Sequence, residues 1–387
     1  MENSTDSQDS SIEIQAVRHC CENQKLIDEL KNQIQDGTLV ISEDSKLQNI
    51  EFISDFEIKT LSISFCIHII PKLNTHQIKK ISINYCRIDS LAELELPNLE
   101  SLQIKDYNIG KFIPSGIREF KKLKELVICG CDNLDLKLIP QQLSKLEISK
   151  CNLKNFELLK QFTQLTNFSF EMKPVIDNTN IDISPISKMV QLVVLNLSNC
   201  NLKNVEYLKS LINLKDLNLA YNGNIDISPL QHLINLTKLN LEECSLIDLT
   251  YLKPLINLKE LTIARNNILY VEPLQKLKQI QYIDAVYNKI IDVSVLNNHP
   301  SYSSFEIYNQ KQPNKQQIAF ANQLRDINAK ITSLRGLQIL RSNIKSLIAL
   351  QRKNVDNCLQ QIFNTQTQFI QQVASSFQKQ NSFEDYQ

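Results

Sequence analysis

The sequence of 387 residues predicts an α/β solenoid, a stack of short repeats in which strands alternate with tight helical turns. Three observations predict this fold class. An apolar pattern recurs along most of the chain at intervals close to 22 residues, and each copy carries the apolar–polar alternation of one short strand. After Pro313 the composition becomes rich in glutamine and asparagine and the apolar spacing becomes helical, which predicts a helical segment behind the array.

The overall composition is that of an ordinary globular protein without net charge. The chain has 42 basic and 42 acidic side chains, which argues against a dedicated nucleic-acid binder, because such a protein needs a basic surface to neutralise phosphates. Residues 1–11 lack the basic and apolar regions of a signal peptide, and no run of about 18 apolar residues could span a membrane. We therefore predict a cytoplasmic protein whose ten cysteines stay as thiols, with cytoskeletal or nuclear association left open.

The first 36 residues are expected to form two segments. Residues 1–12 are polar and acidic, and we predict that they are disordered. Residues 13–36 carry apolar side chains at helical spacing, from Val17 to Ile34, and are predicted to form an N-terminal helix that caps the array.

The repeats are predicted over residues 37–312, in about 12 to 13 copies. The most regular copies begin at residues 192, 214, 236, 258 and 280, each 22 residues after the one before. Looser copies, 20 to 24 residues apart, begin at 58, 78, 99, 123, 143 and 165. An atypical strand at 39–41 precedes them, and a degenerate copy begins at Tyr302. The copy at Leu165 is 27 residues long, which predicts an insertion within 171–180.

Each part of the repeat has a physical role. The alternating leucines give a short strand with one buried face, and stacked neighbours share the core that one copy cannot bury alone. An asparagine or cysteine after the strand, as at Cys244, is expected to be buried where the chain turns. Prolines at similar places in four copies are predicted to begin the turn on the far side, as 3₁₀ or short helices. These prolines are Pro185, Pro229, Pro254 and Pro273.

These residues resemble leucine-rich repeats of the 22-residue class, as found in internalins and in the regulatory subunit of type-1 protein phosphatase. The likeness is strongest in the stretch 224–230, which is echoed at 180–186. The resemblance implies a curved parallel sheet on a concave face, with short 3₁₀ or helical turns on the convex face. It also implies a non-catalytic, intracellular scaffold or adaptor that binds a partner protein on the concave face. As a narrower alternative, it implies a regulatory subunit of a signalling enzyme such as a type-1 protein phosphatase.

Two columns of side chains are predicted to form the concave binding face. One column lies between the last two core positions of each strand, and its candidate binding residues are Asn196, Asn218, Asn240 and Asp284. The other lies two residues after each strand's last core position and holds Tyr221, Glu243, Arg265 and Tyr287 on four successive copies. Because aromatic side chains and arginine anchor many interfaces, we predict a protein-binding site here. The alternative is a chance row of surface residues in which Glu243 and Arg265 form a weak exposed ion pair.

Residues 313–387 are predicted to form a helical, possibly coiled-coil segment, with a phase slip in the apolar stripe at Gly336. The stripe either covers the end of the array or pairs with a second copy, which would make the chain self-associate. The segment carries nine basic and four acidic side chains. Attachment of this basic tail to nucleic acid or to a membrane surface is a further, less favoured alternative.

Nothing in the sequence indicates catalysis. The five histidines are scattered, and His19-Cys20-Cys21 has no second pair at metal-ligand spacing. No phosphate-binding loop, nucleophile elbow or kinase signature occurs. We therefore predict a protein that is not an enzyme and that has no metal site, no cofactor and no small-molecule substrate.

Overall fold

The computed structural model describes the repeats and little of the two ends. The described residues are 28–42, 51–64, 73–85, 91, 94–105, 116–131, 134–172, 182–299, 301–308, 310, 318–319 and 322–323. The chain forms two compact units, the first made of Met1–Asn178 with Asp182–Leu197 and the second of Thr179–Ile181 with Ser198–Gln387.

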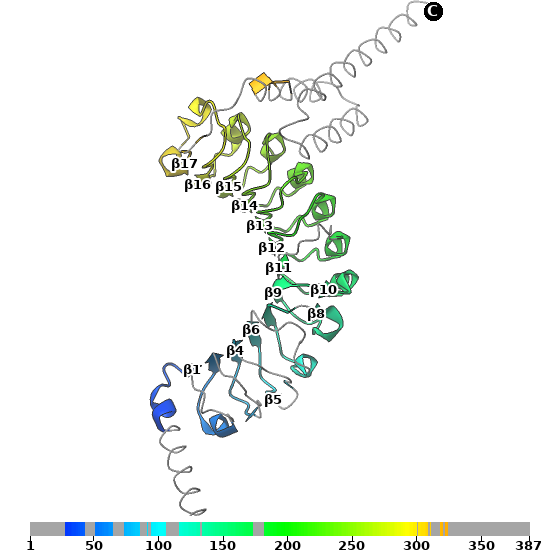
Figure 1. Cartoon of the computed structure of the whole chain (residues 1–387), viewed down its shortest axis with the longest axis vertical. Coiled ribbons are helices and arrows are strands. Elements are labelled where there is room, and N and C mark those ends of the chain that lie inside the picture. Colours follow the sequence, from blue (N-terminus) through cyan, green and yellow to red (C-terminus); the bar gives the residue numbers. More distant parts are fainter. Residues whose placement is uncertain are drawn as a thin grey trace, which may run out of the picture. The chain divides into compact units, whose positions relative to one another are not determined.

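The first unit holds a parallel sheet with one strand from each successive repeat (Figure 1). Its strands are β1 (Thr38–Ser42), β2 (Thr60–Ser64), β4 (Lys80–Asn84), β6 (Ser101–Lys105), β7 (Glu125–Cys129), β9 (Lys145–Cys151), β11 (Asn167–Met172) and β12 (Val194–Asn196). Two small parallel pairs flank it, β3 (Leu73–Asn74) with β5 (Leu94–Glu95) and β8 (Leu134–Asp135) with β10 (Leu153–Lys154). Its 3₁₀ helices are η1 (Glu51–Asp55), η2 (Ile117–Glu119), η3 (Leu136–Leu138), η4 (Phe156–Gln161) and η5 (Ser184–Lys188).

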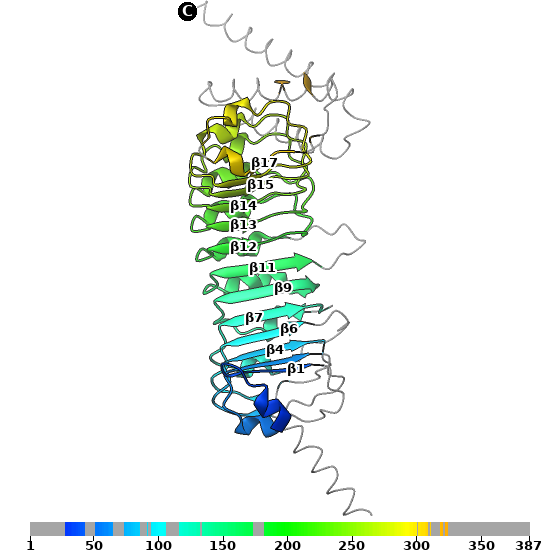
Figure 2. The ribbon, with the colours of Figure 1, turned by 90° about the vertical axis from the view of Figure 1, so that its left-hand side faces the viewer.

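The second unit repeats the same plan with shorter strands. They are β13 (Asp216–Asn218), β14 (Lys238–Asn240), β15 (Glu260–Thr262), β16 (Tyr282–Asp284) and β17 (Phe305–Glu306). Its 3₁₀ helices are η6 (Glu206–Ser210), η7 (Ser228–His232), η8 (Thr250–Leu252), η9 (Glu272–Lys276), η10 (Ser294–Leu296) and η11 (Tyr302–Ser304). Within the unit, strands follow one another in chain order along one side, and most of the 3₁₀ helices lie across the core from them (Figures 1 and 2).

The pairing register confirms the predicted repeat frame. In the second unit Leu217, Leu239, Leu261 and Ile283 are successive register partners, and each is at most 2% exposed. In the first unit the equivalent row runs from Leu61 through Leu146 to Leu195. The 22-residue period therefore superposes like residues on neighbouring strands, so one apolar spine continues through each unit.

The asparagine of the frame is buried and fully hydrogen-bonded. Asn266, which is 4% exposed, bonds through its side-chain nitrogen to three backbone carbonyl oxygens and through its side-chain oxygen to two backbone N–H groups. Asn222 and Asn288 occupy the same position in their own repeats. Each such side chain satisfies buried backbone groups of two adjacent turns, which would otherwise cost free energy.

Cysteine takes this position in other repeats, as predicted. Cys151, Cys200 and Cys244 are all fully buried, and the Cys244 thiol donates to the carbonyl oxygen of Leu219 at 3.1 Å. Burial raises the pKa of the Cys151 thiol to about 12. These cysteines are therefore small, unreactive core residues in the described part of the chain.

The prediction for the prolines was correct in three cases and wrong in one. Pro185, Pro229 and Pro273 lie in the first turn of η5, η7 and η9. Pro254 instead follows η8, which ends at Leu252 and is closed by Lys253. Thr250 begins that helix, because its backbone N–H donates to the Asp248 side chain at 3.1 Å.

Several predictions fall outside the described residues. Residues 28–32 are helical, but the rest of the predicted N-terminal helix is not described. The predicted insertion within 171–180 is described only as far as Met172. Of the segment 313–387, only 318–319 and 322–323 are described, and they are helical. The domain boundaries and self-association through this segment stay predictions.

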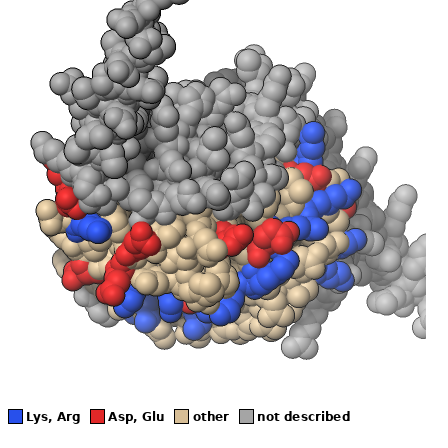
Figure 3. All heavy atoms as spheres, turned by 90° about the horizontal axis from the view of Figure 1, so that it is seen from below, with Lys and Arg blue, Asp and Glu red and all other residues tan. Residues whose placement is uncertain are grey.

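Charge is finely mixed on the described surface seen in Figure 3, where basic and acidic side chains lie next to one another. In the first unit, Glu100 lies 2.8 Å from Lys124 and 3.6 Å from Lys79, and hydrogen bonding and attraction to Lys124 lower the pKa of its carboxyl group. No helix among the described residues has the length and apolar character needed to cross a membrane.

Candidate protein-binding face

The sheet face of the second unit carries the predicted column that begins with Asn218. Register pairing places Asn218, Asn240, Thr262, Asp284 and Glu306 on five successive strands. All five are half-buried, as expected for side chains that leave the sheet next to their neighbours. The eighth predicted site residue, Asn196, belongs to the first unit, where it pairs in register with Ser169.

Three residues of this column also have a structural role that the sequence analysis did not include. The side-chain oxygens of Asn218, Asn240 and Asp284 each accept a hydrogen bond from the backbone N–H two residues further on, at 3.0, 3.0 and 3.2 Å. This contact turns the chain at the end of each strand. Substituting these residues would therefore disturb the turn as well as any bound partner.

The second predicted column is exposed. Tyr221 is 47% and Tyr287 40% accessible to solvent, and Glu243 and Arg265 are exposed between them. All four have left-handed backbone conformations, with φ between 52° and 61°. Their positions are fixed by the array, because the N–H groups of Tyr221, Glu243 and Arg265 each donate to a carbonyl oxygen of the following repeat at 2.8 to 3.1 Å.

Arg265 is held by a different carboxylate from the predicted one. Its Nε lies 3.2 Å from Glu242 Oε1, so the expected pair with Glu243 was wrong by one residue. The guanidinium carbon also lies 4.9 Å from the centre of the Tyr287 ring, within cation–π range. A hydrogen bond to Glu242 raises the pKa of the Tyr221 hydroxyl. Glu242 thus connects Tyr221 with Arg265, and through it with Tyr287.

The sequence contains a signal for Glu242 that the analysis missed. Glu242 takes a position that is occupied by Ala220, Ala264 and Val286 in neighbouring repeats, and these three are buried. A single charged side chain in an otherwise small, apolar column marks a place where the surface departs from the repeat. Tyr308, 56% exposed, continues the same column and was missed as well.

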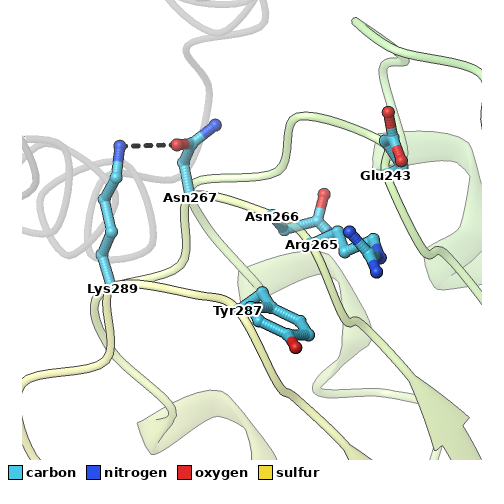
Figure 4. Close-up of a pocket in the computed structure, with 6 residues that line it drawn as sticks. All are labelled: Glu243, Arg265, Asn266, Asn267, Tyr287 and Lys289. Carbon is cyan, nitrogen blue, oxygen red and sulfur yellow. Dashed lines mark hydrogen bonds between the residues drawn. The ribbon is translucent and has the colours of Figure 1, made fainter. Parts of the chain in front are cut away.

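An open pocket of about 340 Å³ lies beside Arg265 and Tyr287 (Figure 4). Glu243, Asn266, Asn267 and Lys289 complete its lining. Lys289 Nζ donates to Asn267 Oδ1 at 2.6 Å, which holds one wall (Figure 4). The lining is polar and contains both signs of charge, so it suits a polar or charged side chain of a partner better than an apolar ligand.

Two carboxylates at the end of the first column lie close together. Asp284 and Glu306 are register partners, and the pKa of Asp284 is raised by burial and further by the carboxylates of Glu306 and Glu242. At the start of the strands, Lys238 Nζ lies 2.7 Å from Glu260 Oε1. In the described part of the chain, no group of three or more histidine, cysteine or acidic side chains could hold a metal ion.

The comparisons with known proteins agree on the fold. An internalin (inlF) from Listeria monocytogenes matches with a TM-score of 0.55 and 20% identity, over 71% of this chain and 87% of that chain. A leucine-rich-repeat protein from Leptospira interrogans matches with a TM-score of 0.52 and 21% identity, over 76% and 83%. The receptor TLR13, solved in complex with ssRNA13, matches with a TM-score of 0.51 and 18% identity, over 73% and 52%.

No family model and no curated protein sequence matches the chain. The likeness to these solved structures therefore concerns the architecture, and it agrees with the register, the buried asparagines and the 3₁₀ turns described above. The chain has the leucine-rich-repeat fold.

Proposed function

We propose that the chain is a non-catalytic interaction protein that binds a partner protein on the sheet face of its second unit. The observation that carries the proposal is the row formed by Tyr221, Glu243, Arg265 and Tyr287, which lies exposed on four successive repeats. Large aromatic side chains and arginine dominate the energetics of protein interfaces, because they bury much area at a small cost in conformational entropy.

The backbone conformation of this row supports selection for binding. A left-handed conformation costs a residue other than glycine or asparagine about 1 kcal/mol or more. Asn199, at the equivalent position one repeat earlier, is the residue type expected on local grounds. Tyrosine, glutamate and arginine have no local advantage there, so their side chains are better explained by what they contact.

The anchors are also pre-organised. The Glu242 carboxylate holds Arg265, and the Arg265 guanidinium lies over the Tyr287 ring. Side chains that are already ordered lose less entropy when a partner binds. A protein partner could insert one side chain into the adjoining pocket and lay a flatter surface over the rest of the row.

Affinity capture from the source cell tests the proposal. The bait is compared with a Tyr221→Ala/Arg265→Ala/Tyr287→Ala variant, and we expect at least one captured protein to be depleted about thirtyfold or more, the loss typical of removing interface anchors. The control is Tyr207→Ala/Tyr251→Ala/Lys253→Ala, which removes the same kinds of side chain from the 3₁₀-helix side of the same unit. Equal recovery of every captured protein by all three baits would refute the proposal.

A further inference from the structure

The last strands of the second unit present tyrosines and carboxylates together. We name this surface the tyrosine–carboxylate face, and its members are Tyr282, Asp284, Tyr287, Glu306, Tyr308 and Glu242. Adjacent parallel strands lie about 4.8 Å apart, so the rows of this face are closely spaced. Tyr308 is 56% and Tyr287 40% exposed, so partner atoms can reach both rings.

The negative charge of this face is only partly balanced. Arg265 pairs with Glu242, whereas neither Asp284 nor Glu306 forms an ion pair with any lysine or arginine in the described part of the chain. Asp284 and Glu306 lie side by side in register, and their mutual repulsion contributes to the raised pKa of Asp284. A cation placed between them would relieve that repulsion.

Arg265 illustrates how this surface holds a cation. Its guanidinium has a carboxylate oxygen at 3.2 Å on Glu242 and an aromatic ring centre at 4.9 Å on Tyr287. The pair Asp284 and Glu306, next to Tyr282 and Tyr308, offers the same two kinds of contact one repeat further along. Guanidinium suits such a place better than ammonium, because it bonds carboxylates in a planar fork and stacks on rings.

We propose that the tyrosine–carboxylate face binds an arginine-bearing segment of the partner protein. This inference rests on the proposed function, since it names the chemistry of the partner that the second unit would bind. The contact is charge-assisted and exposed, so its affinity should fall as salt is added.

Fluorescence anisotropy with the full chain and labelled ten-residue peptides tests the inference. The probes alternate glycine with arginine, with lysine or with glutamate, which spaces like side chains about 6.6 Å apart in an extended peptide. We expect the arginine peptide to bind most tightly, the lysine peptide less tightly, and the glutamate peptide not at all. Asp284→Asn/Glu306→Gln should weaken arginine-peptide binding about tenfold or more at low salt.

Two controls make the result specific. Glu206→Gln/Glu272→Gln changes the net charge equally but on the 3₁₀-helix side, and it should change the affinity less than about twofold. Tyr308→Phe keeps the ring and should retain binding, whereas Tyr308→Ala should weaken it several-fold. Circular dichroism melting curves of all variants confirm that they fold.

Other outcomes would overturn the inference in distinguishable ways. If both carboxylate variants bind the peptide equally, or if no peptide binds, the face does not recognise arginine. The proposed function would still stand if the Tyr221, Arg265 and Tyr287 substitutions abolish capture of a partner. If light scattering shows self-association that only Asp284→Asn/Glu306→Gln abolishes, the occupant is the basic segment 313–387 of a second copy, and the inference of a different partner is wrong.

Discussion

Replacing Asn266 with alanine is expected to lower the free energy of unfolding by about 4 kcal/mol. Asn266 is 4% exposed and makes five hydrogen bonds to backbone groups at 2.8 to 3.0 Å. Its partners are Leu241, Cys244, Leu246, Ile263 and Ala264. Alanine would leave two buried N–H groups without an acceptor, at about 1–3 kcal/mol each. Urea-induced unfolding followed by circular dichroism measures the change.

The control for this substitution is Asn257→Ala in the same repeat. Asn257 also donates to a backbone carbonyl oxygen, that of Ile234 at 2.9 Å, but this bond is exposed to solvent. Water replaces the lost partner, so we expect a change below about 1 kcal/mol. If the two variants lose equal stability, the buried asparagines do not have the structural role given to them here.

Replacing Leu239 with alanine is expected to lower the free energy of unfolding by about 3 kcal/mol. Leu239 lies in the middle of β14, is 2% exposed, and has Leu217 and Leu261 as its register partners on either side. Truncating it removes apolar contact with both neighbours and leaves a cavity. Because repeat units are stable only through their interfaces, two interfaces are weakened by one substitution.

Ile234→Ala provides the matched comparison for Leu239. Ile234 is 51% exposed at the turn that follows η7, so its truncation should change the unfolding free energy by less than about 1 kcal/mol. Hydrogen exchange should also show faster exchange in β13 and β15 of the Leu239 variant, since both flank the cavity. Exchange that changes only within β14 would contradict a spine shared between repeats.

Much of the fold could be predicted because the period carries it. Once copies 22 residues apart are aligned, Leu217, Leu239 and Leu261 must be neighbours, and the register follows. The buried positions of Cys244 and Asn266 follow from the same alignment. Pro254 was misplaced because a helix start depends on local capping, here by Asp248, and capping is not periodic.

The candidate site was predicted less completely, for a related reason. Its columns are periodic, so Tyr221, Arg265 and Tyr287 could be placed on one face from their spacing alone. The partner of Arg265 could not, because Glu242 and Glu243 are adjacent and only the turn geometry decides which side chain points towards it. The division after Leu197 was also missed, since the apolar frame continues without interruption across it.

Site-specific photo-crosslinking tests the central claim most directly. A benzophenone amino acid is placed at Tyr287 on the sheet face, and in a separate protein at Tyr207 on η6, which is similarly exposed at 39%. Illumination in cell extract followed by mass spectrometry identifies what each position touches. The account predicts that a partner protein is crosslinked at 287 and not at 207. Crosslinking of the same protein at 207 alone, or of nothing beyond background at 287, would contradict it.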